Sequence, residues 1–164
     1  MNAAQKELTN RSRTKPAMNA QKELSIAIKL AGTQSAEQIL IILSSSAKYG
    51  WHFSWPSLNH GLDLAILDET GRQIPRNAAG DELADPGSIE PFKGPRSVDI
   101  SKPVTNPLNL GDYFNLLPGH EYRVSVVWKL RVFGSHEELL KFARGTGQRI
   151  ELKAGPFVIR IPEK

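Results

Sequence analysis

His136 and Glu137 open a segment whose residue types are those of a zinc-binding helix. In that motif two histidines four residues apart share one helix face, and a glutamate between them acts as general base. Position 140 is a leucine, so the second ligand is missing. The other three histidines are far apart in the sequence: His52, His60 and His120. The sequence therefore predicts no metal site and no cofactor, unless the fold brings two of the four histidines together with Asp63 or Asp112.

Nucleophiles and phosphate-binding loops are equally poorly supported. Ser44–Ser46 lacks the flanking glycines of a nucleophile elbow, and the chain has no cysteine. Gly145-Thr146-Gly147 is too short to cradle a phosphate and is typical of a helix stop. The acidic residues between 81 and 85 lack the regular oxygen spacing of a calcium loop. We therefore predict no catalytic residues and a protein that is not an enzyme.

Four aromatic residues alternate with smaller ones along one short segment: Tyr49, Trp51, Phe53 and Trp55. In an extended chain every second side chain points the same way, so the four would form one row. An exposed row is a platform on which sugar rings stack, whereas a buried row is part of a core. Both interpretations are open, and the exposed one makes the row a candidate polysaccharide-binding site.

Arg123, Lys129 and Arg131 alternate with apolar residues in a second segment. Two-residue spacing along a strand separates neighbouring side chains of one face by about 7 Å. Such a row of cations can meet an acidic polymer or an acidic protein partner. The alternative is that these charges only keep the outer face of a sheet soluble. The three cations are the second candidate binding site.

Strands are the main elements that position these residues. From Tyr122 to Val132 apolar residues fall at almost every second position, which predicts a long strand with one face in a core. Leu24–Leu30 and Phe157–Ile161 alternate in the same way. Ile39–Leu43 is a continuous apolar run, typical of a central strand covered on both faces.

Turns and one helix separate the strands. Leu62–Pro75 holds an Asp-Glu-Thr-Gly turn between two apolar runs and predicts a hairpin. The segment Arg76–Arg96 is rich in Gly, Pro, Ala and Asp, which predicts a long loop and a candidate binding edge. Ser135 and Glu138 fit a capping box that starts a short helix. About seven strands without strand-helix alternation favour an antiparallel sandwich.

Composition and charge set the limits of the domain. The 164 residues are 40% hydrophobic without cysteine, as in one globular domain whose core needs no disulfide. Residues 1–23 hold five cations against two carboxylates, so most of the net charge of +4 lies there. This predicts a disordered basic tail over 1–23, a near-neutral domain over 24–164, and argues against nucleic acid as partner. No apolar run is long enough for a membrane span or a signal peptide.

The tail contains a near-repeat. Its first copy is Met1-Asn2-Ala3-Ala4-Gln5-Lys6-Glu7-Leu8. The second is Met18-Asn19-Ala20-Gln21-Lys22-Glu23-Leu24, which is shorter by one alanine. The pair is too short for the unit of a repeat protein. A local duplication explains it, or else Met18 is the true start.

Three stretches of the chain resemble bacterial immunoglobulin-like domains. They are Leu62–Pro75, Leu108–Val124 with its Pro-Gly-x-x-Tyr-x-Val motif, and Gly155–Ile161. The resemblance covers Leu24–Pro162 and implies an immunoglobulin-like β-sandwich from a family whose role is open. The chain departs from that pattern in the helix after Ser135, in the long loop before Arg96, and in lacking the cysteines of antibody domains.

Together these observations predict an all-β protein, an immunoglobulin-like antiparallel β-sandwich with one short helix before the C-terminal strands. The expected function is non-catalytic binding of another protein. A carbohydrate-binding module and a loop-based protease inhibitor are the alternatives. The resemblance implies a bacterial envelope or extracellular setting, although the chain shows no signal-peptide pattern.

Overall fold

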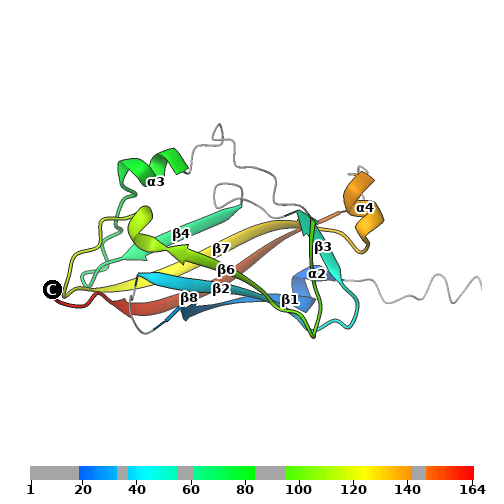
Figure 1. Cartoon of the computed structure of the whole chain (residues 1–164), viewed down its shortest axis with the longest axis horizontal. Coiled ribbons are helices and arrows are strands. Elements are labelled where there is room, and N and C mark those ends of the chain that lie inside the picture. Colours follow the sequence, from blue (N-terminus) through cyan, green and yellow to red (C-terminus); the bar gives the residue numbers. More distant parts are fainter. Residues whose placement is uncertain (1–18, 33–36, 55–60, 84–94, 142–146) are drawn as a thin grey trace, which may run out of the picture.

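The computed structural model of the chain describes residues 19–32, 37–54, 61–83, 95–141 and 147–164 (Figure 1). Most of these residues lie in antiparallel strands, as the alternating sequence predicts. The helical elements are α2 (Ala20–Glu23), α3 (Ala78–Leu83), α4 (His136–Lys141) and the 3-10 turn η1 (Leu110–Asp112). The strands are β1 (Leu24–Leu30), β2 (Gln38–Ser45), β3 (Trp51–Ser54), β4 (Leu62–Leu67), β5 (Pro95–Val98), β6 (Val104–Asn109), β7 (Glu121–Val132) and β8 (Gln148–Arg160).

The described strands form two three-stranded sheets and one two-stranded sheet. One has the order β1-β2-β6, another β4-β7-β8, and β3 pairs with β5. β4 pairs with one edge of β7, and at that edge the amide of Lys129 donates a hydrogen bond to the carbonyl of Gly61, just before β4. Four residues on, Phe133 and His52 exchange backbone hydrogen bonds of 2.7 and 2.8 Å. The backbone N–H and C=O groups of every second residue of a strand face the same edge, and Lys129 and Phe133 are four residues apart. The strands β4 and β3 therefore lie one after the other along the same edge of β7.

A single hydrophobic cluster joins the sheets. Every second residue of β7 from Tyr122 to Val132 is buried in it, which confirms the predicted long strand. The cluster also takes the inward residues of β2 and β8. Figure 1 shows the long strands running along the molecule, with α3 and α4 toward opposite ends. None of the described helices is long and apolar enough to cross a membrane.

Strand β2 corrects one prediction. Its residues Ile39, Ile41 and Leu43 are fully buried, but Leu40 and Ile42 between them are only half-buried. The strand has β1 and β6 at its two edges, so its backbone is paired on both sides. Only one of its faces packs against the core, however, and the expected cover on both faces is wrong.

The segment Arg76–Arg96 is not the irregular loop that its composition predicts. It contains α3 and the start of β5, while residues 84–94 lie outside the described residues. Asn77 explains the helix, because its side-chain Oδ1 accepts a 2.7 Å hydrogen bond from the amide of Gly80. The backbone amide of Asn77 also donates to Tyr113 at 2.7 Å, which ties the start of α3 to the body.

Both predicted local motifs are present. At the hairpin, Asp68 Oδ1 accepts hydrogen bonds from the amides of Thr70 and Arg72 and from the Thr70 hydroxyl, and these bonds lower the Asp68 pKa. Its return arm is shorter than expected, with a single bridge between Leu67 and Gln73. At α4, Ser135 Oγ accepts a 3.1 Å bond from the amide of Glu138, as the capping prediction requires.

The predicted tail is ordered at its end. Residues 20–23 form α2, and Ala20 is fully buried in the cluster. The prediction of a disordered tail is therefore wrong for these residues, and residues 1–18 lie outside the described residues. The predicted strand Phe157–Ile161 is the end of a longer strand, β8, which begins at Gln148 and has a pairing irregularity opposite Val124 and Val126.

Candidate functional site

The aromatic row does not form an exposed platform. Trp51 and Phe53 are 1% and 0% exposed, so the exposed interpretation is wrong for both. Their strand β3 continues the edge of β7, which turns their side chains into the hydrophobic cluster. Tyr49 is 41% exposed, and Trp55 lies outside the described residues. The sugar-binding hypothesis thereby loses its central tryptophan.

The carboxylate of Glu23 accepts hydrogen bonds from two residues of the aromatic row, Tyr49 and Trp51. The Trp51 indole Nε1 donates a 2.7 Å hydrogen bond to Glu23 Oε2, and the Tyr49 hydroxyl donates to Glu23 Oε1. The bond to this carboxylate, followed by burial and the negative charge, raises the pKa of Tyr49 to about 12. Sequence reasoning missed Glu23 because it stands in the segment assigned to the tail. No residue near Glu23 in the sequence signals these two hydrogen bonds.

The predicted basic row does lie on an exposed surface. Arg123, Lys129 and Arg131 are all exposed on the outward face of β7, whose alternate residues are buried. The register adds outward cations from β8, which the sequence could not assign to the same face. We call the six the basic face: Arg123, Lys129, Arg131, Arg149, Lys153 and Arg160.

Carboxylates are interspersed among these cations. The outward residues of the same sheet include three of them: Asp63, Glu121 and Glu151. Lys129 Nζ lies 3.6 Å from Asp63 Oδ2, and Lys153 Nζ lies 3.6 Å from Glu151 Oε1. Both ion pairs are solvent-exposed, so each adds little to stability. The three carboxylates do not balance the six cations, so the basic face keeps a net positive charge.

Arg131 and Arg149 stand directly opposite each other in the β7–β8 register. Like charges at such positions destabilise a sheet. The Arg131 guanidinium carbon lies 5.5 Å from the centre of the Phe133 ring, so the side chain is held over that ring. Gly147 leaves it room, because a Cβ there would lie 2.7 Å from Arg131 Nε. These contacts fix the position of the Arg131 side chain opposite Arg149.

The fold brings two of the scattered histidines together. The rings of His52 and His136 lie 6.1 Å apart between centroids, one on β3 and one at the start of α4. No group of three metal-ligating residues occurs within the described part of the chain. Burial lowers the pKa of His52, and the nearby His136 lowers it further. His52 can respond to pH, but the described residues supply the two histidines with no third ligand for a metal.

Acidification should therefore weaken the fold through His52. Its folded pKa lies below the ordinary 6.5, so the unfolded chain binds its proton first as the pH falls. The free energy of unfolding should decrease as the pH drops below about 6.5. Urea denaturation between pH 8 and 5 measures this, and His136→Asn should reduce the pH dependence because one of its two causes is removed. Equal pH dependence in both proteins would contradict the assignment.

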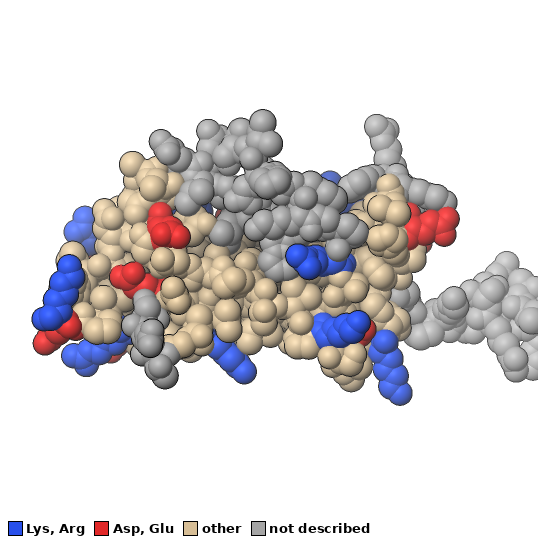
Figure 2. All heavy atoms as spheres, in the orientation of Figure 1, with Lys and Arg blue, Asp and Glu red and all other residues tan. Residues whose placement is uncertain are grey.

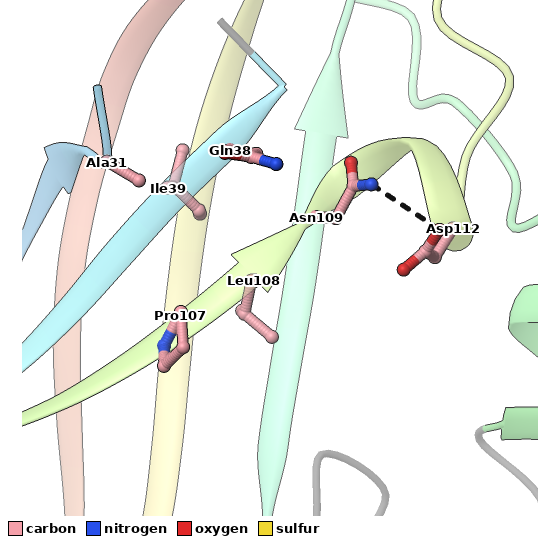
Figure 3. Close-up of a pocket in the computed structure, with 7 residues that line it drawn as sticks. All are labelled: Ala31, Gln38, Ile39, Pro107, Leu108, Asn109 and Asp112. Atoms are coloured by element: carbon pink, nitrogen blue, oxygen red, sulfur yellow. Dashed lines mark hydrogen bonds between the residues drawn. The ribbon is translucent and has the colours of Figure 1, made fainter. Parts of the chain in front are cut away.

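A recess lies at one end of the β1-β2-β6 sheet (Figure 3). Its volume is about 370 Å³, and its lining is Ala31, Gln38, Ile39, Pro107, Leu108, Asn109 and Asp112. The Asn109 side chain is already engaged, accepting from the amide of Gly111 and donating to Asp112. These lining residues include one carboxylate and no cation, histidine or hydroxyl side chain. They do not form a catalytic arrangement.

Charge is unevenly spread over the surface. On the face shown in Figure 2, acidic side chains lie toward the two ends, while lysine and arginine side chains lie at the ends and also along the lower edge and right of the centre. The outward face of the β1-β2-β6 sheet carries little charge, since Lys29 is the one charged residue among its described outward positions. Charge therefore distinguishes the outward faces of the two three-stranded sheets.

Comparison with models of protein families and with curated proteins found no match to this chain. The geometry of the surface is therefore the basis for a functional proposal.

Proposed function

We propose that the chain is an immunoglobulin-like sandwich of the kind its sequence resembles. Two features support this. In immunoglobulin domains the first, second and fifth main strands share one sheet, while the third, sixth and seventh share the other. The orders β1-β2-β6 and β4-β7-β8 follow the same scheme if β4, β6, β7 and β8 take the places of the third, fifth, sixth and seventh strands. The pair β3–β5 is then additional, and the described residues hold no fourth strand beside β6.

Tyr122 is the second feature. It lies at the start of β7, is 2% exposed, and its hydroxyl accepts a 2.9 Å hydrogen bond from the amide of Leu117. A tyrosine at this strand position that bonds the backbone a few residues upstream is the tyrosine corner of immunoglobulin-like sandwiches. The motif Pro-Gly-x-x-Tyr-x-Val places that tyrosine in the sequence.

We further propose that this module is non-catalytic and binds an acidic protein surface through the basic face. The opposed pair Arg131 and Arg149 carries the proposal. Sheet stability does not account for two like charges in direct opposition, whereas a partner carboxylate between them would accept hydrogen bonds from both guanidinium groups. Solubility alone would be served equally well by alternating charges.

A protein fits this face better than a nucleic acid does. Asp63, Glu121 and Glu151 lie among the cations, and a nucleic-acid duplex, whose phosphates stand at fixed and regular spacing, would set some of those phosphates against these carboxylates. A protein surface can place its own cations opposite these three carboxylates and its carboxylates opposite the arginines. The carbohydrate alternative is weakened because Trp51 is buried in the core and cannot stack on a sugar ring. No contact among the described residues favours protease inhibition over general protein binding.

Arg149→Glu tests the effect of the opposed arginines on stability, and Arg131→Glu/Arg149→Glu tests their effect on binding. The single substitution replaces a repulsive cross-strand pair by an attractive one, so stability should stay equal or rise by about 0.2–1 kcal/mol. Affinity for immobilised polyglutamate, the probe for an acidic surface, should fall about tenfold or more in the double variant Arg131→Glu/Arg149→Glu. Surface plasmon resonance and urea denaturation measure the two effects.

Lys29→Glu/Lys102→Glu is the matched control. It makes the same change in net charge at exposed positions away from the basic face. Equal loss of polyglutamate binding in the two double variants would show a dependence on net charge alone and refute the proposal. Tighter binding to duplex DNA than to polyglutamate at the same salt concentration would refute it in favour of nucleic acid.

A further inference from the structure

The second copy of the repeat is seated on the body of the protein by specific contacts. Ala20 is fully buried, and its amide donates a 3.1 Å hydrogen bond to Gln148 Oε1. The carboxamide of Gln21 makes two bonds with the backbone of Glu151. Its Nε2 donates to the carbonyl at 2.7 Å, and its Oε1 accepts from the amide at 3.0 Å.

The other end of the same segment is held equally closely. The Glu23 carboxylate accepts from Trp51 and Tyr49, and its backbone carbonyl accepts a 2.9 Å bond from the amide of Ser46. Leu24 is 3% exposed. We call the surface that receives residues 20–24 the seat, formed by Tyr49, Trp51, Gln148 and Glu151.

The first copy of the repeat carries every side chain that the seat uses. Ala4–Leu8 reads Ala-Gln-Lys-Glu-Leu, identical to Ala20–Leu24. The two copies differ just before this stretch, where Ala3 replaces Asn19. Asn19 makes no side-chain capping bond, and only its backbone carbonyl accepts from α2. An alanine at this position therefore loses no capping hydrogen bond.

We propose that the seat binds Ala4–Leu8 of the same chain as an alternative to Ala20–Leu24. The seat is then a receptor for an Ala-Gln-x-Glu-Leu segment, and the two copies compete for it. When the first copy is bound, the residues between Leu8 and Ser25 must form a loop, because both ends of that segment then lie beside the seat. The loop-closure entropy disfavours this state by a factor on the order of 10², so Ala20–Leu24 is the principal occupant. The first copy takes over when the second is impaired.

Two pairs of substitutions in the full chain test this proposal. Gln21→Ala/Glu23→Ala removes the hydrogen-bonding side chains of the second copy, and Gln5→Ala/Glu7→Ala removes those of the first. The first-copy pair alone should leave the urea midpoint unchanged. The second-copy pair should lower the folding equilibrium constant by no more than about 10²-fold, the loop-closure factor. Combining both pairs should lower it by a further tenfold or more.

The Trp51 indole N–H reports on occupancy directly, because a Glu23 or Glu7 carboxylate must accept its hydrogen bond. Its ¹⁵N–¹H resonance, assigned with Trp51→Phe, should keep a hydrogen-bonded shift in the second-copy variant and lose it in the combined variant. Identical midpoints and indole shifts in these two variants would overturn the proposal. Failure of the second-copy variant to fold would also overturn it, since the first copy would not have replaced the second. A midpoint that rises with protein concentration would overturn the same-chain form, because the occupant would come from another molecule.

Discussion

Trp51→Ala is expected to lower the free energy of unfolding by about 3–5 kcal/mol. The side chain is 1% exposed in the cluster, and its ring contacts Tyr49 in an edge-to-face arrangement with 5.9 Å between centroids. Truncation leaves a large cavity and also removes the indole donor to Glu23. Urea denaturation followed by circular dichroism measures the loss.

Two variants separate the contributions. Trp51→Phe keeps an aromatic ring and removes the indole N–H, so it should cost less than the alanine change. Tyr49→Phe alters a residue that is 41% exposed and should cost less again. The interpretation of Trp51 as a core residue would be refuted by a Trp51→Ala protein that unfolds at the wild-type urea concentration.

Gly155→Ala is expected to lower the free energy of unfolding by about 2–3 kcal/mol, the second-largest effect among the single substitutions. The residue has φ of 102°, where side chains are strained, and an added Cβ would lie 2.5 Å from the carbonyl oxygen of Val124. It stands where the pairing of β7 with β8 shifts. Moving that backbone would disturb the register that aligns the two ends of β8 with β7. Thermal and urea unfolding measure the effect.

Gly32→Ala provides the control. Apart from its chain neighbours, no atom of the described residues lies within 4 Å of a Cβ at that position, so the effect on the free energy of unfolding should remain within about 0.5 kcal/mol. Equal stability of the two glycine variants would contradict the strain assigned to Gly155.

Local patterns predicted the parts of the fold that depend on nearest neighbours. The alternation from Tyr122 to Val132 identifies β7 and its buried face, because a one-residue slip would expose Trp128. The hairpin turn at Asp68 and the cap at Ser135 also follow from residue types within a few positions.

Features that depend on distant pairing were not accessible in this way. The basic row was predicted from Arg123, Lys129 and Arg131, but the opposition of Arg131 to Arg149 follows only from the β7–β8 register. Glu23 was assigned to a tail because nothing near it in sequence reveals the hydrogen bond to Trp51. The burial of the aromatic row was undecided, since alternation fixes which side chains share a side and not which side faces the core.

The two hydrogen bonds of Gln21 also bear on self-association. Among the described strands β8 pairs only with β7, which leaves its other edge without a strand partner. Free edges of this kind template pairing with other chains and lead to aggregation. At Glu151 the Gln21 carboxamide occupies the amide and carbonyl that an incoming strand would need. A side chain thus imitates a neighbouring strand, and the segment that anchors the N-terminal end of the domain also protects its last strand from intermolecular pairing.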